Sequence, residues 1–180
     1  SGLIELILAV ENKDLLSVKD NLAKIFPLDK VQELRFPDDP NRLYQVKYKG
    51  QSNIEEWIQD FIVTIPLILA DPYMYSPENI LTGPGIIHNQ GTEETPLTIE
   101  IEGPASDIEL FIGENRIKFS GAIGGTERLV IDGAKFEVTL DKKNVLNRLQ
   151  GNLNPIPTGL IPVSCSSTSV TWRWRNRWAA

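Results

Sequence analysis

FIVTIPLILADPYMYS, residues 61–76, is the stretch that divides this chain into two parts. Residues 61–70 form a nearly continuous apolar run, rich in β-branched side chains and too short to span a bilayer, which predicts a strand buried on both faces. The run stops at Asp71-Pro72, and the two glycines of Gly83-Pro84-Gly85 then permit sharp turns. We therefore expect one domain at residues 1–80 and a second at residues 81–180.

The first of these domains has the pattern of a small α+β unit. Residues 2–10 predict a buried strand, and residues 31–36 and 43–49 alternate as half-buried strands do. Residues 38–41, DDPN, are typical of a turn. Between Asn12, a capping residue, and Pro27, a helix terminator, four apolar residues share one helical face: Leu15, Val18, Leu22 and Ile25. We expect one helix here, packed with strands.

The second domain changes to short strands separated by turn residues at close intervals, which is typical of an antiparallel β-sandwich. The expected strands are residues 85–89, 97–102, 108–112, 115–120, 127–132, 136–140, 163–165 and 169–174. Residues 145–149 predict a short helical turn, and residues 153–162 an extended, proline-containing loop. The predicted fold class is therefore mainly β: an α+β unit followed by a sandwich.

The composition excludes several classes of protein. The chain has 180 residues, enough for two small cores, and an ordinary soluble balance of 41% hydrophobic and 23% charged residues. Its net charge of −6 argues against nucleic-acid binding and against attachment to anionic membranes. With one cysteine and one histidine, an intrachain disulfide is impossible, and neither a Cys/His metal site nor a cofactor is expected.

The C-terminal residues 170–178, VTWRWRNRW, alternate strictly between two chemistries. An aromatic platform beside a basic strip would suit sugars or single-stranded nucleic acid, with Trp172, Trp174 and Trp178 as the stacking rings. A closing strand would instead bury its aromatic face and direct its other face outward. Period two favours the closing strand, because it puts the two chemistries on opposite faces. The arginines could then meet an acidic neighbouring subunit: Arg173, Arg175 and Arg177.

The remaining reactive residues do not form a catalytic constellation. His88 has no second histidine and no nucleophile in an elbow beside it, and Cys165 between two serines predicts an inert thiol. The glycine-rich residues 121–126 lack the helix that a phosphate loop needs. Tyr73 and Tyr75 fit either a subunit contact or packing near the domain joint. We expect no enzymatic activity.

The order and spacing of four sequence blocks resemble the distal tail protein family of long-tailed bacteriophages, over nearly the whole chain. The blocks are ELRFPDDP at 33–40; ADPYMYS at 70–76; NQGT at 89–92 with PLTI at 96–99; and VIDG at 130–133, leading through Leu149, Pro155, Gly159 and Val163 to VTWRWR at 170–175. Family members carry further strands before the position of Ser1, so the resemblance implies that the first domain lacks its first N-terminal strands. The sequence shows no galectin sugar-binding motif.

This resemblance implies a fold and a structural function. The first domain would be a ring-forming unit that assembles into a hexamer under the tail tube, and the second a galectin-like sandwich that projects outward. The partners implied are other copies of the chain, the tail tube protein, a tail-associated tip protein and a receptor-binding protein. The protein would be made in the bacterial host cytoplasm and located in the virion. The alternative is a carbohydrate-binding sandwich module for host-surface adhesion.

Overall fold

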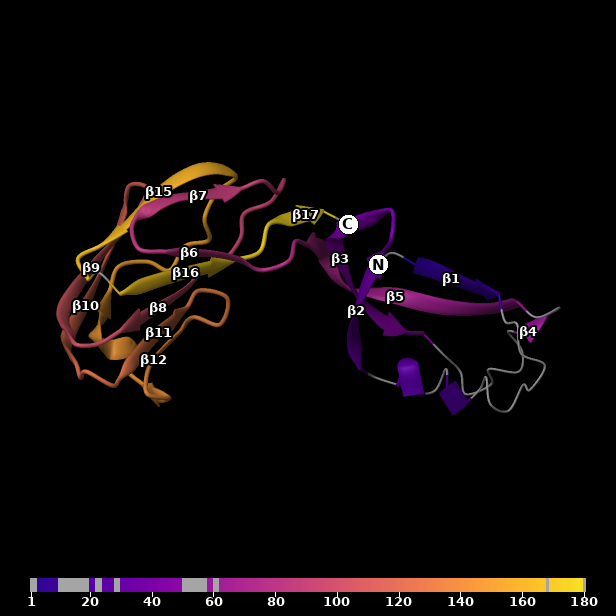
Figure 1. Cartoon of the computed structure of the whole chain (residues 1–180), viewed down its shortest axis with the longest axis horizontal. Coiled ribbons are helices and arrows are strands. Elements are labelled where there is room, and N and C mark those ends of the chain that lie inside the picture. Colours follow the sequence, from indigo (N-terminus) through magenta and orange to yellow (C-terminus); the bar gives the residue numbers. More distant parts are fainter. Residues whose placement is uncertain are drawn as a thin grey trace. The chain divides into compact units, whose positions relative to one another are not determined.

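The computed structural model describes residues 3–9, 20–21, 24–27, 30–49, 58–59, 62–167 and 169–179. The chain forms two compact units, the first made of Ser1–Tyr75 with Ala179–Ala180 and the second of Ser76–Trp178 (Figure 1). The prediction of a mainly β chain that contains a β-sandwich is confirmed.

The first unit is built around one antiparallel sheet (Figure 1). Its strands lie in the order β1 (Leu3–Ala9), β5 (Ile62–Tyr75), β3 (Asp39–Tyr48) and β2 (Val31–Phe36), and β4 (Ile58–Gln59) also pairs with β5. Val46, Ile65 and Leu67 form the centre of its small core. The partly buried residues that pack against this centre are Ile4, Leu6, Phe26, Leu34, Tyr44, Tyr48 and Leu69.

The strand β5 differs from its prediction in two ways. It does not stop at Asp71-Pro72 but continues to Tyr75. The pairing of β5 with β3 shifts register just before Met74, so the exposed Pro72 lies where the ladder is irregular and requires no N–H from it. The prediction of burial on both faces was also wrong, because Pro66 and its neighbours on that face are partly exposed.

Most of the predicted helix falls outside the described residues. Asp20, Asn21, Lys24 and Ile25 are helical, which agrees with its C-terminal end, whereas Leu15, Val18 and Leu22 are not described. The predicted turn at 38–41 is displaced: Pro37 and Asp38 form the turn, and β3 already begins at Asp39.

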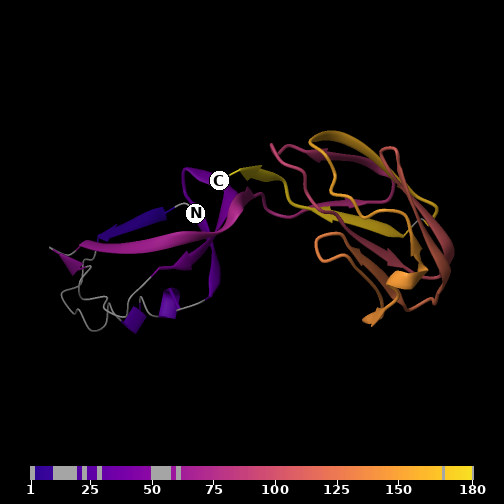
Figure 2. The same ribbon diagram turned by 180° about the vertical axis from the view of Figure 1, so that it is seen from behind.

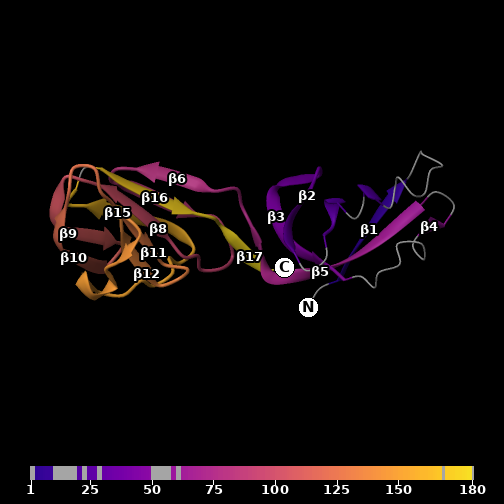
Figure 3. The ribbon, with the colours of Figure 1, turned by 90° about the horizontal axis from the view of Figure 1, so that it is seen from below.

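The second unit is a sandwich of two antiparallel sheets whose layers can be followed in Figures 2 and 3. In the part of the chain that the structure describes, the five-stranded sheet has the order β14 (Leu149–Gln150), β10 (Asn115–Ile123), β9 (Ala105–Ile112), β15 (Gly159–Cys165) and β7 (Gly85–Asn89). The six-stranded sheet has the order β13 (Lys143–Asn144), β12 (Glu137–Leu140), β11 (Arg128–Asp132), β8 (Thr98–Glu102), β16 (Val170–Trp174) and β6 (Asn79–Thr82).

The core of this sandwich is filled by the alternate side chains of both sheets, as period-two patterning requires. The fully buried members include Ile87, Ile99, Ile101, Leu110, Phe119, Leu129, Ile131 and Trp172. The predicted helical turn is present as a 3-10 helix, η2 (Leu146–Arg148). The strand β6 was not predicted, because its four residues lie between the prolines that indicated a loop.

Candidate interaction surfaces

The C-terminal segment is not one continuous strand. The strand β16 ends at Trp174, and β17 (Arg177–Ala179) begins only after Arg175 and Asn176. Asn176 is 5% exposed, and its amide N–H donates to the hydroxyl oxygen of Ser76 at 2.9 Å while its side-chain oxygen accepts from the amide of Gln90 at 3.2 Å. These bonds replace ladder pairing at this point, so the predicted alternation over 170–178 is interrupted.

The three tryptophans do not share one exposed face. Trp172 is completely buried, and its indole N–H donates a 2.8 Å hydrogen bond to the carbonyl oxygen of Gly83. Trp174 and Trp178 are partly buried, and Trp174 packs against the core of the sandwich. Trp172 therefore belongs to the core, and its ring offers no stacking surface to a sugar.

Arg173 meets acidic partners within its own unit, on the outer face of the six-stranded sheet. Its guanidinium contacts Glu100 at 3.2 Å and Glu78 at 3.0 Å. Arg128 extends this network through Glu102 at 3.0 Å and Glu100 at 3.6 Å. The charge of Glu100, followed by the hydrogen bond that Arg173 donates to Glu78, raises the pKa of Arg173 above its ordinary value. This network ties β8, β11, β16 and Glu78, the residue just before β6, together across the outer face of the sheet.

Arg175 and Arg177 hold the neighbouring loop through their backbones. The Arg175 carbonyl oxygen accepts from the hydroxyl of the buried Thr95 at 2.6 Å. The Arg177 carbonyl oxygen accepts from the amides of Thr92 at 2.9 Å and Glu93 at 3.1 Å. Both arginine side chains are partly exposed. These bonds fix the backbone of Arg175 and Arg177 in the fold, whatever their side chains bind.

Tyr73 and Tyr75 lie at the end of β5 and contact one another edge to face, with ring centroids 6.5 Å apart. Tyr75 is 8% exposed, and its hydroxyl donates to the Asp71 carboxylate at 2.7 Å. Tyr73 is more exposed, and its backbone amide donates to the same carboxylate at 3.0 Å. Asp71 thus orders this end of the strand, and Tyr73 is the tyrosine with more surface left for a partner.

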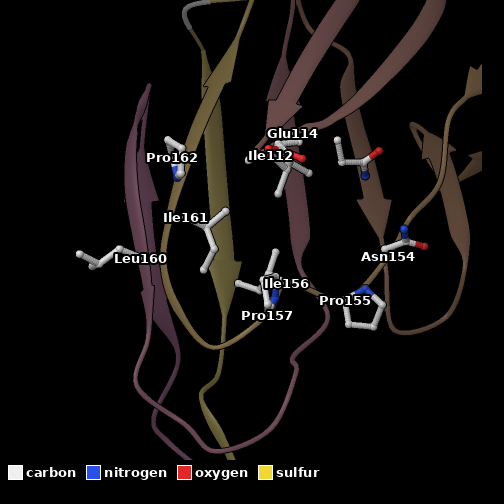
Figure 4. Close-up of a pocket in the computed structure, with 11 residues that line it drawn as sticks. Ile112, Glu114, Asn154, Pro155, Ile156, Pro157, Leu160, Ile161 and Pro162 are labelled. Atoms are coloured by element: carbon white, nitrogen blue, oxygen red, sulfur yellow. The ribbon is translucent and has the colours of Figure 1, made fainter.

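The second unit also has a groove of about 390 Å³ at the start of β15 (Figure 4). It is lined by Ile112–Asn115, Asn154–Pro157 and Leu160–Pro162. Its walls are mainly apolar, and Glu114, Asn115 and Asn154 supply the polar side chains. The groove was not predicted, because the prolines of residues 153–162 indicated only an extended loop, whereas residues 159–162 already belong to β15.

The remaining residues that the sequence analysis considered for catalysis or metal binding do not form a site together. His88 is exposed on β7, and Cys165 is partly buried at the end of β15, where burial raises the pKa of its thiol. Among the described residues, no three His, Cys, Asp or Glu side chains gather as a metal site would require. No helix in that same part of the chain is long and apolar enough to cross a membrane.

Comparisons with known proteins show what the second unit and the whole chain are similar to. Residues 90–178 match the family model of the siphovirus-type tail component, C-terminal domain. No curated protein sequence matches the chain. Among solved structures, the chain is similar to the Dit protein of phage SPP1, described as a paradigm of the hub adsorption apparatus in phages that infect Gram-positive bacteria. The TM-score is 0.73 at 17% identity, over 97% of this chain and 78% of the other, which shows a shared fold.

Proposed function

We propose, from the premise that residues 90–178 belong to the siphovirus-type tail component family, that this chain forms a ring which joins the phage tail tube to the proteins of the tail tip. The resemblance to phage distal tail proteins is confirmed, and the chain is a structural component of a phage tail. The ring and the connection to the tube are our proposal.

The family match over residues 90–178 is the observation that carries this proposal. The fold supports it, because the similarity to SPP1 Dit also includes the first unit, where the family model does not match. Since a hub acts through its surfaces, a structural rather than an enzymatic role fits a chain whose candidate residues hold strands and loops in place.

The two units would divide this work. We assign ring formation to the first unit, with six copies as the family resemblance implies, and outward projection to the sandwich. The partners would be other copies of this chain, the tail tube protein, a tail-associated tip protein and a receptor-binding protein. Assembly would follow synthesis in the host cytoplasm.

Three of the candidate interface residues suit contact with a neighbouring copy better than the other two. Arg173 holds Glu78 and Glu100 of its own sheet, and Tyr75 is nearly buried, so both support the fold. Tyr73, Arg175 and Arg177 also interact within the chain, and they keep partly exposed side chains on hydrogen-bonded backbone. We therefore assign the contacts between copies to these three residues.

Charge reversal tests this assignment. Arg175→Glu should lower the mass of the assembled particle, measured by native mass spectrometry, because it replaces attraction to an acidic neighbour by repulsion. Arg128→Glu is the matched control, since it makes the same change in charge on a side chain bound to Glu102 of the same unit. Equal masses for wild type and both variants would overturn the role of Arg175.

A further inference from the structure

The edges of the sandwich are protected unequally. On one side, the outer strands β13 and β14 have two residues each, and Lys143 and Arg148 put charges beside them. On the other side, β7 is five residues long, GIIHN, and contains no Asp, Glu, Lys or Arg. Long, uncharged edges are what soluble β proteins normally avoid, because the free backbone groups pair with another strand.

The open backbone groups of β7 can be located from its neighbour. The amide of Gly113 donates to the carbonyl oxygen of Pro162 at 2.8 Å, so the backbone groups of Pro162 point toward β9 and away from β7. Because these directions alternate along a strand, Ile161 and Val163 point toward β7 and bond their partners Ile87 and Gly85. The N–H and C=O groups of the two β7 residues on either side of Ile87 therefore point outward.

These outward residues are Ile86 and His88, and among the described residues no backbone partner is found for their outward N–H and C=O groups. Their side chains lie on the outer face of the sheet, next to Pro162 and Leu160 respectively. Ile86 is 61% exposed and Leu160 is 69% exposed. The free edge thus borders an apolar surface. Covering that surface with another chain would be favourable, because it would remove apolar area from water.

We propose that β7 of one copy pairs antiparallel with β7 of a second copy, with Ile87 at the twofold axis. Ile86 of each copy would then lie opposite His88 of the other, and each such pair would exchange both of its backbone hydrogen bonds. The exposed Ile86, Leu160 and Pro162 of the two copies would meet along the seam.

The absence of charged residues from β7 favours a second copy of this chain as its partner. A twofold contact pairs a strand with the same strand of the second copy, so a charged residue near the axis comes close to a residue of the same charge. The strand β7 avoids this repulsion despite the net charge of −6 on the whole chain. The opposite side would not, because Lys143 on β13 would meet a second Lys143. This contact does not rest on the proposed ring.

Mixed disulfides test the register directly. In a Cys165→Ser background, Ile86→Cys and His88→Cys chains are mixed in equal amounts and oxidised. Directly opposite residues would have Cα atoms about 5.5 Å apart, within disulfide reach, whereas the diagonal pairs that like chains offer would be about 7–8 Å apart. We expect covalent dimers in the mixture only. A mixture of Ile86→Cys with Phe111→Cys, on the same face but away from the edge, should give none.

A second pair of variants tests the backbone contact without cysteines. His88→Pro removes the outward N–H, and an edge strand tolerates proline at such a position. His88→Thr keeps the N–H. Sedimentation equilibrium of the full chain should show self-association through β7 weakened about tenfold or more by proline and unchanged by threonine. Equal association of the two variants, with no mixed disulfide, would overturn the proposal, and a ring formed by the first unit would survive that result.

Discussion

The amide of Asn176 donates a 2.9 Å hydrogen bond to the hydroxyl oxygen of Ser76, and the amide of Ser76 donates a 3.0 Å bond to the carbonyl oxygen of Asn176. The two residues are 100 positions apart in sequence, and both are buried. The Ser76 hydroxyl also accepts from the Asn79 side chain at 3.2 Å. This pair therefore joins the segment that enters β6 to the segment that leaves β16, and it closes one end of the sandwich.

Removing the Ser76 hydroxyl should destabilise the second unit. Ser76→Ala leaves the buried amide of Asn176 without its acceptor, which costs about 1–3 kcal/mol. Unfolding in guanidinium chloride, followed by tryptophan fluorescence, measures the loss. Ser106→Ala is the control, because Ser106 is exposed on β9. A variant of Ser76 that unfolds at the wild-type denaturant concentration would show that the bond contributes nothing.

Two tryptophans of one strand should respond differently to the same substitution. Trp172→Phe removes the bond to the Gly83 carbonyl and leaves a gap in the core, at a cost of about 2–3 kcal/mol. Trp174→Phe should cost less than half as much, because its buried indole N–H has no hydrogen-bond partner among the described residues and its ring is only partly buried. Thermal unfolding of both variants compares them. A larger loss for Trp174→Phe would contradict the account.

A single methyl group should distinguish two glycines. A Cβ atom at Gly91 would collide with the backbone of Arg177, whereas a Cβ atom at Gly125 would meet no atom within 4 Å. Gly91→Ala should therefore displace the loop that Arg177 holds and lower the stability of the second unit by more than 2 kcal/mol, roughly the range of overpacked cores. Gly125→Ala should be nearly neutral. Equal unfolding temperatures for the two variants would show that the backbones of residues 91 and 177 are farther apart than described.

Acid should weaken the outer face of the five-stranded sheet through Glu109. Hydrogen bonds from Arg116, then Lys118, lower the pKa of Glu109, so its stabilising contribution is present above the pKa of the unfolded chain and is lost as pH falls through the lowered folded pKa. Glu109→Gln should thus be less stable than wild type at neutral pH and equal to it in strong acid. High salt should shrink the neutral-pH difference, because the Glu109 side chain is partly exposed to solvent. A difference that stays constant with pH would exclude the ionic origin.

Most of the fold could be predicted from the sequence, because the patterns that define its strands are local. The strands β2 and β7 were predicted with their observed bounds, since alternating residues between turn residues define both ends. The continuation of β5 past Pro72 was not, because the register shift that accommodates this proline depends on the partner strand β3. Proline alone signals a break, and the sequence of one strand does not show how its neighbour pairs.

The roles of the candidate residues were harder to predict from the sequence, because they depend on contacts between distant segments. Alternation correctly separated Trp172 from Arg173, yet nothing in residues 170–178 shows that Glu78 and Glu100 receive this arginine. The interruption at Asn176 likewise depends on Ser76 and Gln90. An asparagine within an otherwise regular aromatic and basic strand was the one local signal that could have indicated it.

Molar mass in solution tests the central claim most directly. Wild type and the His88→Pro variant, whose pairing through β7 should be weakened about tenfold or more, are measured as full chains by multi-angle light scattering across a concentration series. The ring proposal predicts that the variant keeps a mass near six chains at every concentration, and that wild type has the same mass or twice that mass if rings pair through β7. A variant with the mass of one chain throughout the series would contradict ring assembly by this chain.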